Sequence, residues 1–126
     1  VFVSLHRAEG FGLVMAEAMI VGTPVIATNW SSNTEFMNSD VACMVDCKFI
    51  TLEKDSPPYK KGSVWADPNV EQAARYMRKL YKEPTYYEYL KKKAHEYIIK
   101  KLSMENAVSA LEKRVGEIYE AFERNI

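Results

Sequence analysis

The chain has 126 residues, of which 48% are hydrophobic and 27% are charged, a composition typical of one globular domain. Its 17 basic residues balance 17 acidic ones, which argues against a nucleic-acid binder that relies on net positive charge. No apolar run approaches the roughly 20 residues that a membrane-spanning helix needs. Two cysteines, Cys43 and Cys47, are too few for a disulfide scaffold and are predicted to be free thiols.

The first 45 residues have the pattern of an alternating α/β fold. Short apolar runs predict parallel strands over residues 1–5, 24–28 and 41–45. A helical pattern over residues 13–21 separates the first two strands, and Gly22 follows it as a helix stop. This order is half of a doubly wound unit. We therefore expect a partial Rossmann-like α/β fold, with a parallel sheet of about three strands and flanking helices.

The middle of the chain offers weaker signals. Residues 49–66 show no sustained period and are predicted to be irregular. Asp67 and Pro68 predict the N-cap and first residue of a helix that continues to about Tyr81.

Two further helices are expected towards the C-terminus. Thr85 and Glu88 have the spacing of a capping box, which predicts a helix to about Leu102. Ser103 is the predicted cap of a last helix. Its apolar positions recur three and four residues apart and predict a face that packs on a core or a partner: Ala107, Val108, Leu111, Val115, Ile118, Tyr119 and Phe122.

A cluster of lysines and tyrosines lies in the second of these helices. The run Lys91–Lys93 follows Tyr86, Tyr87 and Tyr89. Such a cluster suits peripheral contact with a membrane surface. A solvated helix face with partly buried tyrosines is the alternative explanation, and the sequence leaves both open.

The clearest chemical signal is the turn between the first strand and the first helix. Two glycines, Gly10 and Gly12, let an anion approach the backbone where the helix begins with unpaired N–H groups. Open α/β sheets bind ligands at this end of their strands. Glu9 and Glu17 flank the turn and are placed to accept hydrogen bonds from hydroxyl groups. These residues indicate a phosphorylated, hydroxyl-rich ligand.

The spacing of the two glutamates is an E-x7-E motif. The segment that contains this motif, EGFGLVMAEAMIVGTPVIAT, resembles the donor-binding domain of retaining GT-B glycosyltransferases, glycosyltransferase family 4 (group 1). The segments Gly22–Ile26, Glu35–Phe36 and Trp65–Pro68 also resemble family patterns, and Ser103 stands where a serine often precedes the final helix. Many members have a Gly-Gly pair after the second strand, where this chain has Trp30–Asn33, so the backbone path there is left open.

The resemblance implies a role for each residue of the turn. Glu9 would contact the hydroxyls of the donor sugar as the catalytic-site glutamate, and Glu17 would bind the ribose of the nucleotide. His6 would line the site, with a structural histidine as the alternative. The backbone of four residues would hold the sugar and the diphosphate: Gly10, Phe11, Gly12 and Leu13.

The resemblance also implies what the chain belongs to. Residues 1–126 would be one fragment of the C-terminal nucleotide-sugar-binding domain, inactive alone, with the acceptor domain and the first part of the donor domain outside it. The intact enzyme, of the hexosyltransferase type, would transfer a sugar with retention from a UDP-, GDP- or dTDP-linked donor to a glycan or lipid-linked acceptor. It would act in surface polysaccharide synthesis in the cytoplasm, at the inner face of the membrane, without a metal or cofactor.

Three other expectations complete the sequence-based interpretation. The strand over residues 1–5 would form an open sheet edge, and such an edge favours self-association. A nucleotide-binding oxidoreductase is disfavoured because no G-x-G-x-x-G motif follows Leu5. A non-catalytic nucleotide-binding or interaction module remains as the alternative function.

Overall fold

Three short parallel strands form the centre of the fold. In the computed structural model, which describes residues 1–124, β1 (Phe2–Ser4), β2 (Val25–Thr28) and β3 (Cys43–Val45) pair in that order. The strand β1 lies at the edge of this sheet, and β2 lies between its two neighbours. The predicted α/β class and parallel sheet are confirmed. Each strand is one or two residues shorter than the apolar run that predicts it.

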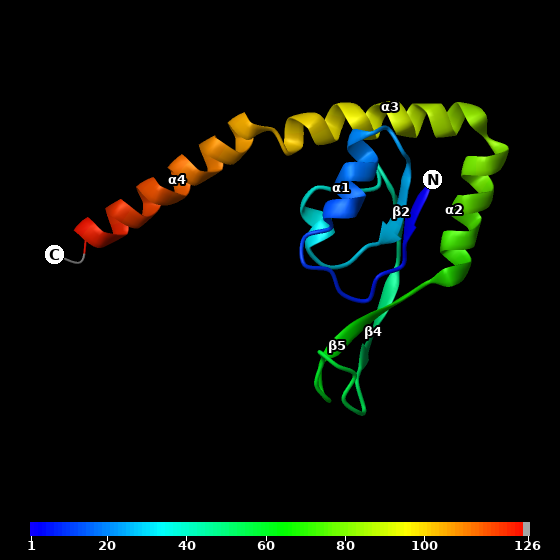
Figure 1. The fold of residues 1–126 in the computed structure, drawn as a ribbon, viewed down its shortest axis with the longest axis horizontal. Helices are drawn as coiled ribbons and strands as arrows, with labels where there is room; N and C mark the ends of the chain where they lie inside the picture. The colour runs from blue at the N-terminus through cyan, green and yellow to red at the C-terminus, as the bar shows by residue number, and fades with distance from the viewer. Residues whose placement is uncertain (125–126) are drawn as a thin grey trace.

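Helices cover both faces of this sheet (Figure 1). One face carries α1 (Leu13–Ile20) and the 3₁₀ helix η1 (Ser32–Glu35), and the other carries α2 (Val70–Lys82). The long helix α3 (Pro84–Lys101) contributes side chains to both layers.

The alternation of side chains along β2 explains why the sheet is buried on both faces. Val25 and Ala27 pack in the cluster that includes α1 and Ile98 of α3, whereas Ile26 packs with Leu80 of α2. Successive strand residues point to opposite faces, so a wholly apolar strand must be covered twice. The central strand therefore fixes the three-layer arrangement.

The helix α1 ends where the glycine pattern predicts. Gly22 has a φ of 73° and donates its N–H to the carbonyl of Met19, while Thr23 donates to the carbonyl of Ala18. Such a left-handed residue closes the last turn of a helix. His95 of α3 donates from Nδ1 to the carbonyl of Ile20 at 2.6 Å, and this bond joins the end of α1 to α3.

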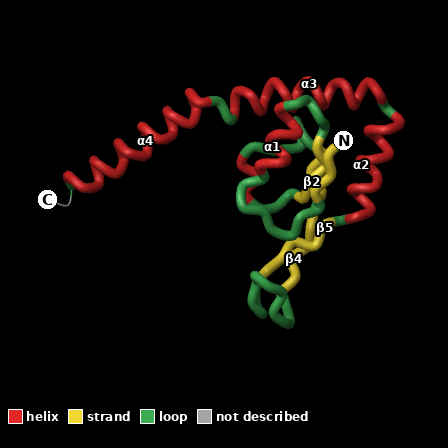
Figure 2. The backbone as a smooth tube through the Cα atoms, in the orientation of Figure 1, coloured by secondary structure: helices red, strands yellow, loops and turns green. Residues whose placement is uncertain are grey.

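The prediction of an irregular segment over residues 49–66 is confirmed for the loop of residues 52–63 and is wrong at both ends. Residues Cys47–Thr51 form β4 and Val64–Pro68 form β5, and the two strands pair antiparallel as a hairpin that leaves the carboxyl end of the sheet (Figure 2). Their β-branched and aromatic residues suit strands. The pairing joins segments separated by a loop, so it left no continuous periodic signal in the sequence.

Two predicted helix starts are also wrong. Asp67 and Pro68 end β5, and the N-cap of α2 is Asn69, whose side-chain oxygen accepts the N–H of Gln72 at 3.0 Å. The helix α3 begins at Pro84, one residue before Thr85, and no side chain caps it. Proline suits a first helical position because its missing N–H has no helical partner there.

The last helix, α4 (Met104–Glu123), extends away from the α/β body (Figure 1). Its predicted cap is confirmed, since the hydroxyl of Ser103 accepts the N–H of Asn106 at 3.2 Å. None of the residues from Met104 to Glu123 is buried, so the apolar stripe that the sequence predicts is exposed. Across residues 1–124 no helix has both the length and the apolar character to cross a bilayer.

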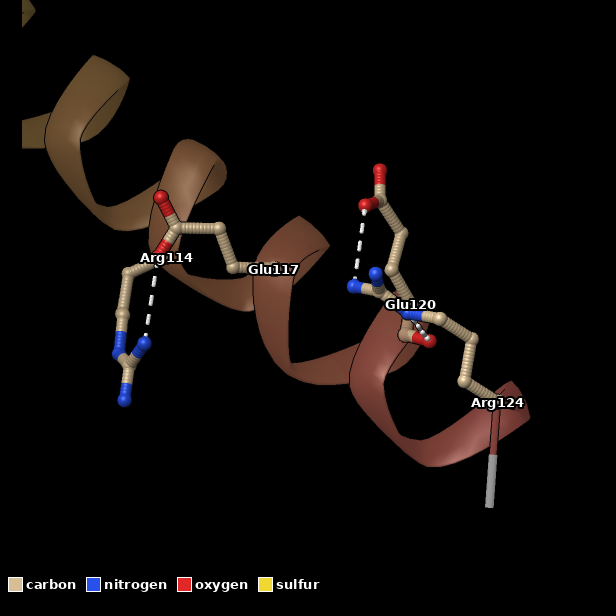
Figure 3. Close-up of polar contacts among 4 residues, drawn as sticks. All are labelled: Arg114, Glu117, Glu120 and Arg124. Atoms are coloured by element: carbon tan, nitrogen blue, oxygen red, sulfur yellow. Dashed lines mark hydrogen bonds and ion pairs between the residues drawn. The ribbon is translucent and has the colours of Figure 1, made fainter. Parts of the chain in front are cut away.

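Local ion pairs support this exposed helix. Arg114 lies 3.1 Å from Glu117, and Arg124 lies 3.9 Å from Glu120 (Figure 3). Pairs at these spacings contribute about 0.2–0.5 kcal/mol each to a helix. The helical conformation of α4 therefore rests on interactions within the helix itself.

Two neighbouring isoleucines of α3 test the packing of the core. Ile98 is fully buried and Ile99 is 49% exposed. We expect Ile98→Ala to lower the free energy of unfolding by about 2–5 kcal/mol because it leaves a cavity between α3 and α1. The matched variant Ile99→Ala should cost less than about 1 kcal/mol. Equal losses in urea denaturation would contradict the described packing of α3.

Candidate functional site

The turn that follows β1 is fixed by a histidine at its start. His6 Nε2 lies 2.9 Å from the carbonyl oxygen of Trp30 and 3.1 Å from Oδ1 of Asn33, and Nδ1 lies 3.1 Å from the hydroxyl of Ser4. Because a carbonyl oxygen can only accept, Nε2 must carry the proton. The buried Asn33 also donates to the carbonyl of Thr28 at 3.1 Å. His6 thus joins the two loops that leave β1 and β2.

A serine makes a second connection between these loops. The hydroxyl of Ser31 donates to the carbonyl of Glu9 at 2.7 Å and accepts the N–H of the same residue at 3.2 Å. The hydroxyl of Ser32 lies 3.2 Å from the same carbonyl. Both polar groups of the Glu9 backbone are therefore hydrogen-bonded, and the loop over residues 30–33 contacts the turn directly.

Ser31 keeps the backbone conformation of a glycine. Its φ is 80° and its ψ is −167°, a region that is essentially restricted to glycine and costs other residues about 1–3 kcal/mol. The two hydrogen bonds from its hydroxyl to Glu9 offset part of that strain. The structure thereby shows how a serine occupies a backbone conformation that suits glycine.

Gly12 forms the N-cap of α1 in a left-handed conformation, with φ 93° and ψ 34°. A Cβ atom here would lie 2.9 Å from Met15 Cε, 3.1 Å from Phe36 and 3.2 Å from Asn33. No side chain caps this helix and no acidic residue lies in its first turn. The first N–H groups of a helix have no partner within the helix, so this turn offers donors and a favourable dipole to an anion.

The remaining predicted site residues lie on or beside this turn. Glu9 is half-buried, and one of its carboxylate oxygens accepts the N–H of Gly10 at 3.0 Å. Phe11 packs its ring against Phe36, with centroids 5.4 Å apart, and stays 45% exposed. Leu13 and Glu17 are exposed on α1.

Arg7 connects the turn to the hairpin, a role that the sequence did not reveal. Its guanidinium lies 3.1 Å from Asp67 and 5.9 Å from the ring centroid of Trp65, and its carbonyl accepts the N–H of Ala66 at 3.0 Å. Trp65 and Asp67 are two positions apart in β5, so they share one face of the strand. A single arginine can therefore contact both.

Cys43 lies in the core, away from the turn. Burial raises the pKa of its thiol, and its sulfur lies 3.9 Å from the hydroxyl of Tyr86, whose pKa burial raises to about 12. Both groups are therefore uncharged near neutral pH and act as packing residues. Cys43 and Cys47 are free, as predicted. Within residues 1–124 no three His, Cys, Asp or Glu side chains gather as metal ligands.

Comparison with known proteins adds independent information. The family described as "Glycosyl transferases group 1" matches residues 1–97, which include the sheet, the turn and most of α3. The chain is also similar to "Putative glycosyltransferase ORF313" of Acidianus filamentous virus 1 (isolate United States/Yellowstone), with 40% identity over 47 residues. That match covers 37% of this chain and 15% of the viral protein, so the chain spans a small part of this relative.

The two glycines of the turn form a matched pair for mutagenesis. Gly12→Ala places a side chain in a left-handed conformation and against three neighbours, so we expect a loss of about 2–4 kcal/mol in the free energy of unfolding. A Cβ atom at Gly10 would meet nothing within 4 Å, and Gly10→Ala should change stability by less than about 0.5 kcal/mol. Similar denaturation midpoints for the two variants would contradict the described geometry.

Two replacements of Ser31 separate strain from hydrogen bonding. Ser31→Ala loses both bonds to Glu9 and keeps the strained backbone, whereas Ser31→Gly loses the same bonds but relieves the strain. The glycine variant should therefore exceed the alanine variant by about 1 kcal/mol or more in unfolding free energy. Ser32→Ala, which loses one longer bond, serves as the control. A glycine variant no more stable than the alanine variant would show that Ser31 is unstrained.

Proposed function

Since the chain belongs to the group 1 glycosyl transferases, we propose that the turn between β1 and α1 binds the sugar and the diphosphate of a nucleotide-sugar donor. The whole enzyme would transfer that sugar, a hexose, to a glycan or a lipid-linked acceptor with retention of configuration. We place it among the GT-B enzymes of glycosyltransferase family 4 and in the synthesis of surface polysaccharides.

The observation that carries this proposal is the uncapped start of α1. A diphosphate needs several donors and a backbone that it can approach closely. Gly12 lacks a side chain, and its left-handed backbone lies beside the unpaired N–H groups of the first helical turn. No acidic side chain lies in the first helical turn of α1, so no carboxylate there repels an anion or occupies these helical donors.

The two glutamates are placed at either end of such a ligand. Glu9 has its backbone fixed by Ser31, so its carboxylate can orient the hydroxyls of the transferred sugar. Glu17 is exposed on α1, one and a half helical turns beyond Gly12, or about 7 Å along the axis. In this arrangement Glu17 accepts the ribose hydroxyls of the nucleotide, while Glu9 and Gly12 define the sugar and diphosphate positions.

His6 acts by positioning in this proposal. Both of its ring nitrogens are engaged with Ser4, Trp30 and Asn33. It therefore sets the path of the backbone through which the turn holds the donor. Arg7 likewise contributes by holding the hairpin, since its guanidinium is paired with Asp67.

Nucleoside diphosphates test the proposal directly. We expect UDP, GDP or dTDP to raise the Tm of the chain in proportion to the logarithm of its concentration above the Kd. For the nucleotide that binds, Glu17→Ala should weaken binding by about 1–3 kcal/mol, or roughly 5- to 150-fold in Kd, because the ribose hydroxyls lose their acceptor.

A matched glutamate provides the control for this experiment. Glu112 is exposed on α4, and Glu112→Ala should leave the nucleotide Kd unchanged. If all three nucleotides leave the Tm unchanged, the turn is not a nucleotide site. If one nucleotide binds and the Glu17→Ala variant binds it with the wild-type Kd, Glu17 does not contact the nucleotide.

A further inference from the structure

Two exposed aromatic rings lie beside the proposed donor site. Trp30 follows β2 and Phe49 belongs to β4, and their ring centroids are 4.6 Å apart in an edge-to-face arrangement. Trp30 is 38% exposed and Phe49 is 56% exposed. We call this pair the aromatic platform. The pair therefore presents aromatic ring surface, close to the proposed ligand-binding turn, that a ligand can contact.

The platform is rigidly connected to the backbone of Glu9 through Trp30. The carbonyl of Trp30 accepts a hydrogen bond from His6 at 2.9 Å. The next residue, Ser31, bonds to both the N–H and the carbonyl of Glu9. The position of the tryptophan is therefore fixed relative to the glutamate that we assign to the transferred sugar.

The hairpin fixes Phe49 against the same turn from another direction. Phe49 pairs with Ala66 in the register of β4 and β5, and Ala66 donates its N–H to the carbonyl of Arg7 at 3.0 Å. The ion pair between Arg7 and Asp67 lies on the adjoining part of β5. Both rings are thus attached to backbone that is hydrogen-bonded to the β1–α1 turn. Because this backbone is fixed, little conformational entropy is lost when a ligand stacks on the rings.

We propose that the aromatic platform binds a pyranose ring of the carbohydrate acceptor, next to the transferred sugar. This proposal rests on the proposed function, because it takes Glu9 as the sugar end of the donor site and Glu17 as the ribose end. The platform is joined to Glu9, which places its occupant on the sugar side, away from the nucleotide.

The chemistry of the surface fits a carbohydrate. One face of a pyranose presents polarised C–H groups that pack on the negative face of an aromatic ring, while its hydroxyls need polar partners at the edge. The exposed side chain of Asn29 adjoins Trp30 in the chain and offers an amide to such hydroxyls. A pyranose therefore meets apolar and polar groups together here.

Simple glycosides and NMR test this assignment. The ¹⁵N-labelled chain is titrated with methyl α-D-glucopyranoside, methyl α-D-mannopyranoside and methyl β-D-galactopyranoside, with the open-chain polyol sorbitol as the control. The indole N–H of Trp30 is identified by its loss in Trp30→Phe. We expect at least one glycoside to shift that signal saturably, while sorbitol does not.

Variants show whether both rings take part. Phe49→Ala should weaken glycoside binding at least fivefold. Phe122→Ala, which removes a still more exposed ring from α4, should leave the glycoside Kd unchanged. Trp30→Phe keeps a ring and should retain saturation transfer to the glycoside C–H protons, whereas Trp30→Ala should lose it. Unchanged backbone amide signals confirm that each variant is folded.

The outcomes separate this proposal from the donor proposal. If a nucleoside diphosphate shifts the amides of Leu13 and Val14 but no glycoside moves the Trp30 indole, the platform proposal fails and the donor proposal stands. If UDP itself moves the indole, the platform contacts the nucleotide and the acceptor assignment is overturned. Glycoside binding without any nucleotide binding overturns the donor proposal and, with it, the assignment of the platform to the acceptor.

Discussion

The hydrogen bonds of His6 and Ser31 join the loops after β1 and β2, and the candidate site depends on that junction. Parallel strands end in loops with few backbone partners, so their geometry has to come from side chains. Asn33 is fully buried and uses both ends of its amide, to His6 and to Thr28. Losing such a residue leaves buried polar groups unpaired, at about 1–3 kcal/mol each.

Much of the body could be predicted because its signals are local. Continuous apolar runs reveal β1, β2 and β3, and Gly22 marks the end of α1. The hairpin of β4 and β5 could not be predicted because its strands pair across the loop of residues 52–63, and single-sequence periodicity does not register that pairing. The N-cap of α2 at Asn69 could not be predicted for a related reason, since Asp67 and Pro68 belong to the extended strand β5.

In the candidate site, too, the local features can be predicted from the sequence and the long-range contacts cannot. Glu9, Gly12 and Glu17 lie within one short segment, where a motif and the physics of a helix start both apply. The partners that hold this segment come from far away in the chain: Ser31 binds Glu9 from 22 positions on, and Asp67 pairs with Arg7 from the hairpin. Side-chain contacts of this separation leave no pattern in one sequence. The residues of the turn, His6 included, can therefore be predicted from the sequence, whereas the contacts of Ser31 and Asp67 with it cannot.

Because α4 extends away from the α/β body, it can unfold and refold separately from that body. Since none of its residues is buried, its backbone amides exchange with solvent according to a helix–coil equilibrium of its own. Amides of β2, covered on both faces, exchange only when the whole α/β body opens. One polypeptide therefore contains two cooperative units, and the slope of a denaturant transition followed at the tryptophans reports the surface of the body alone.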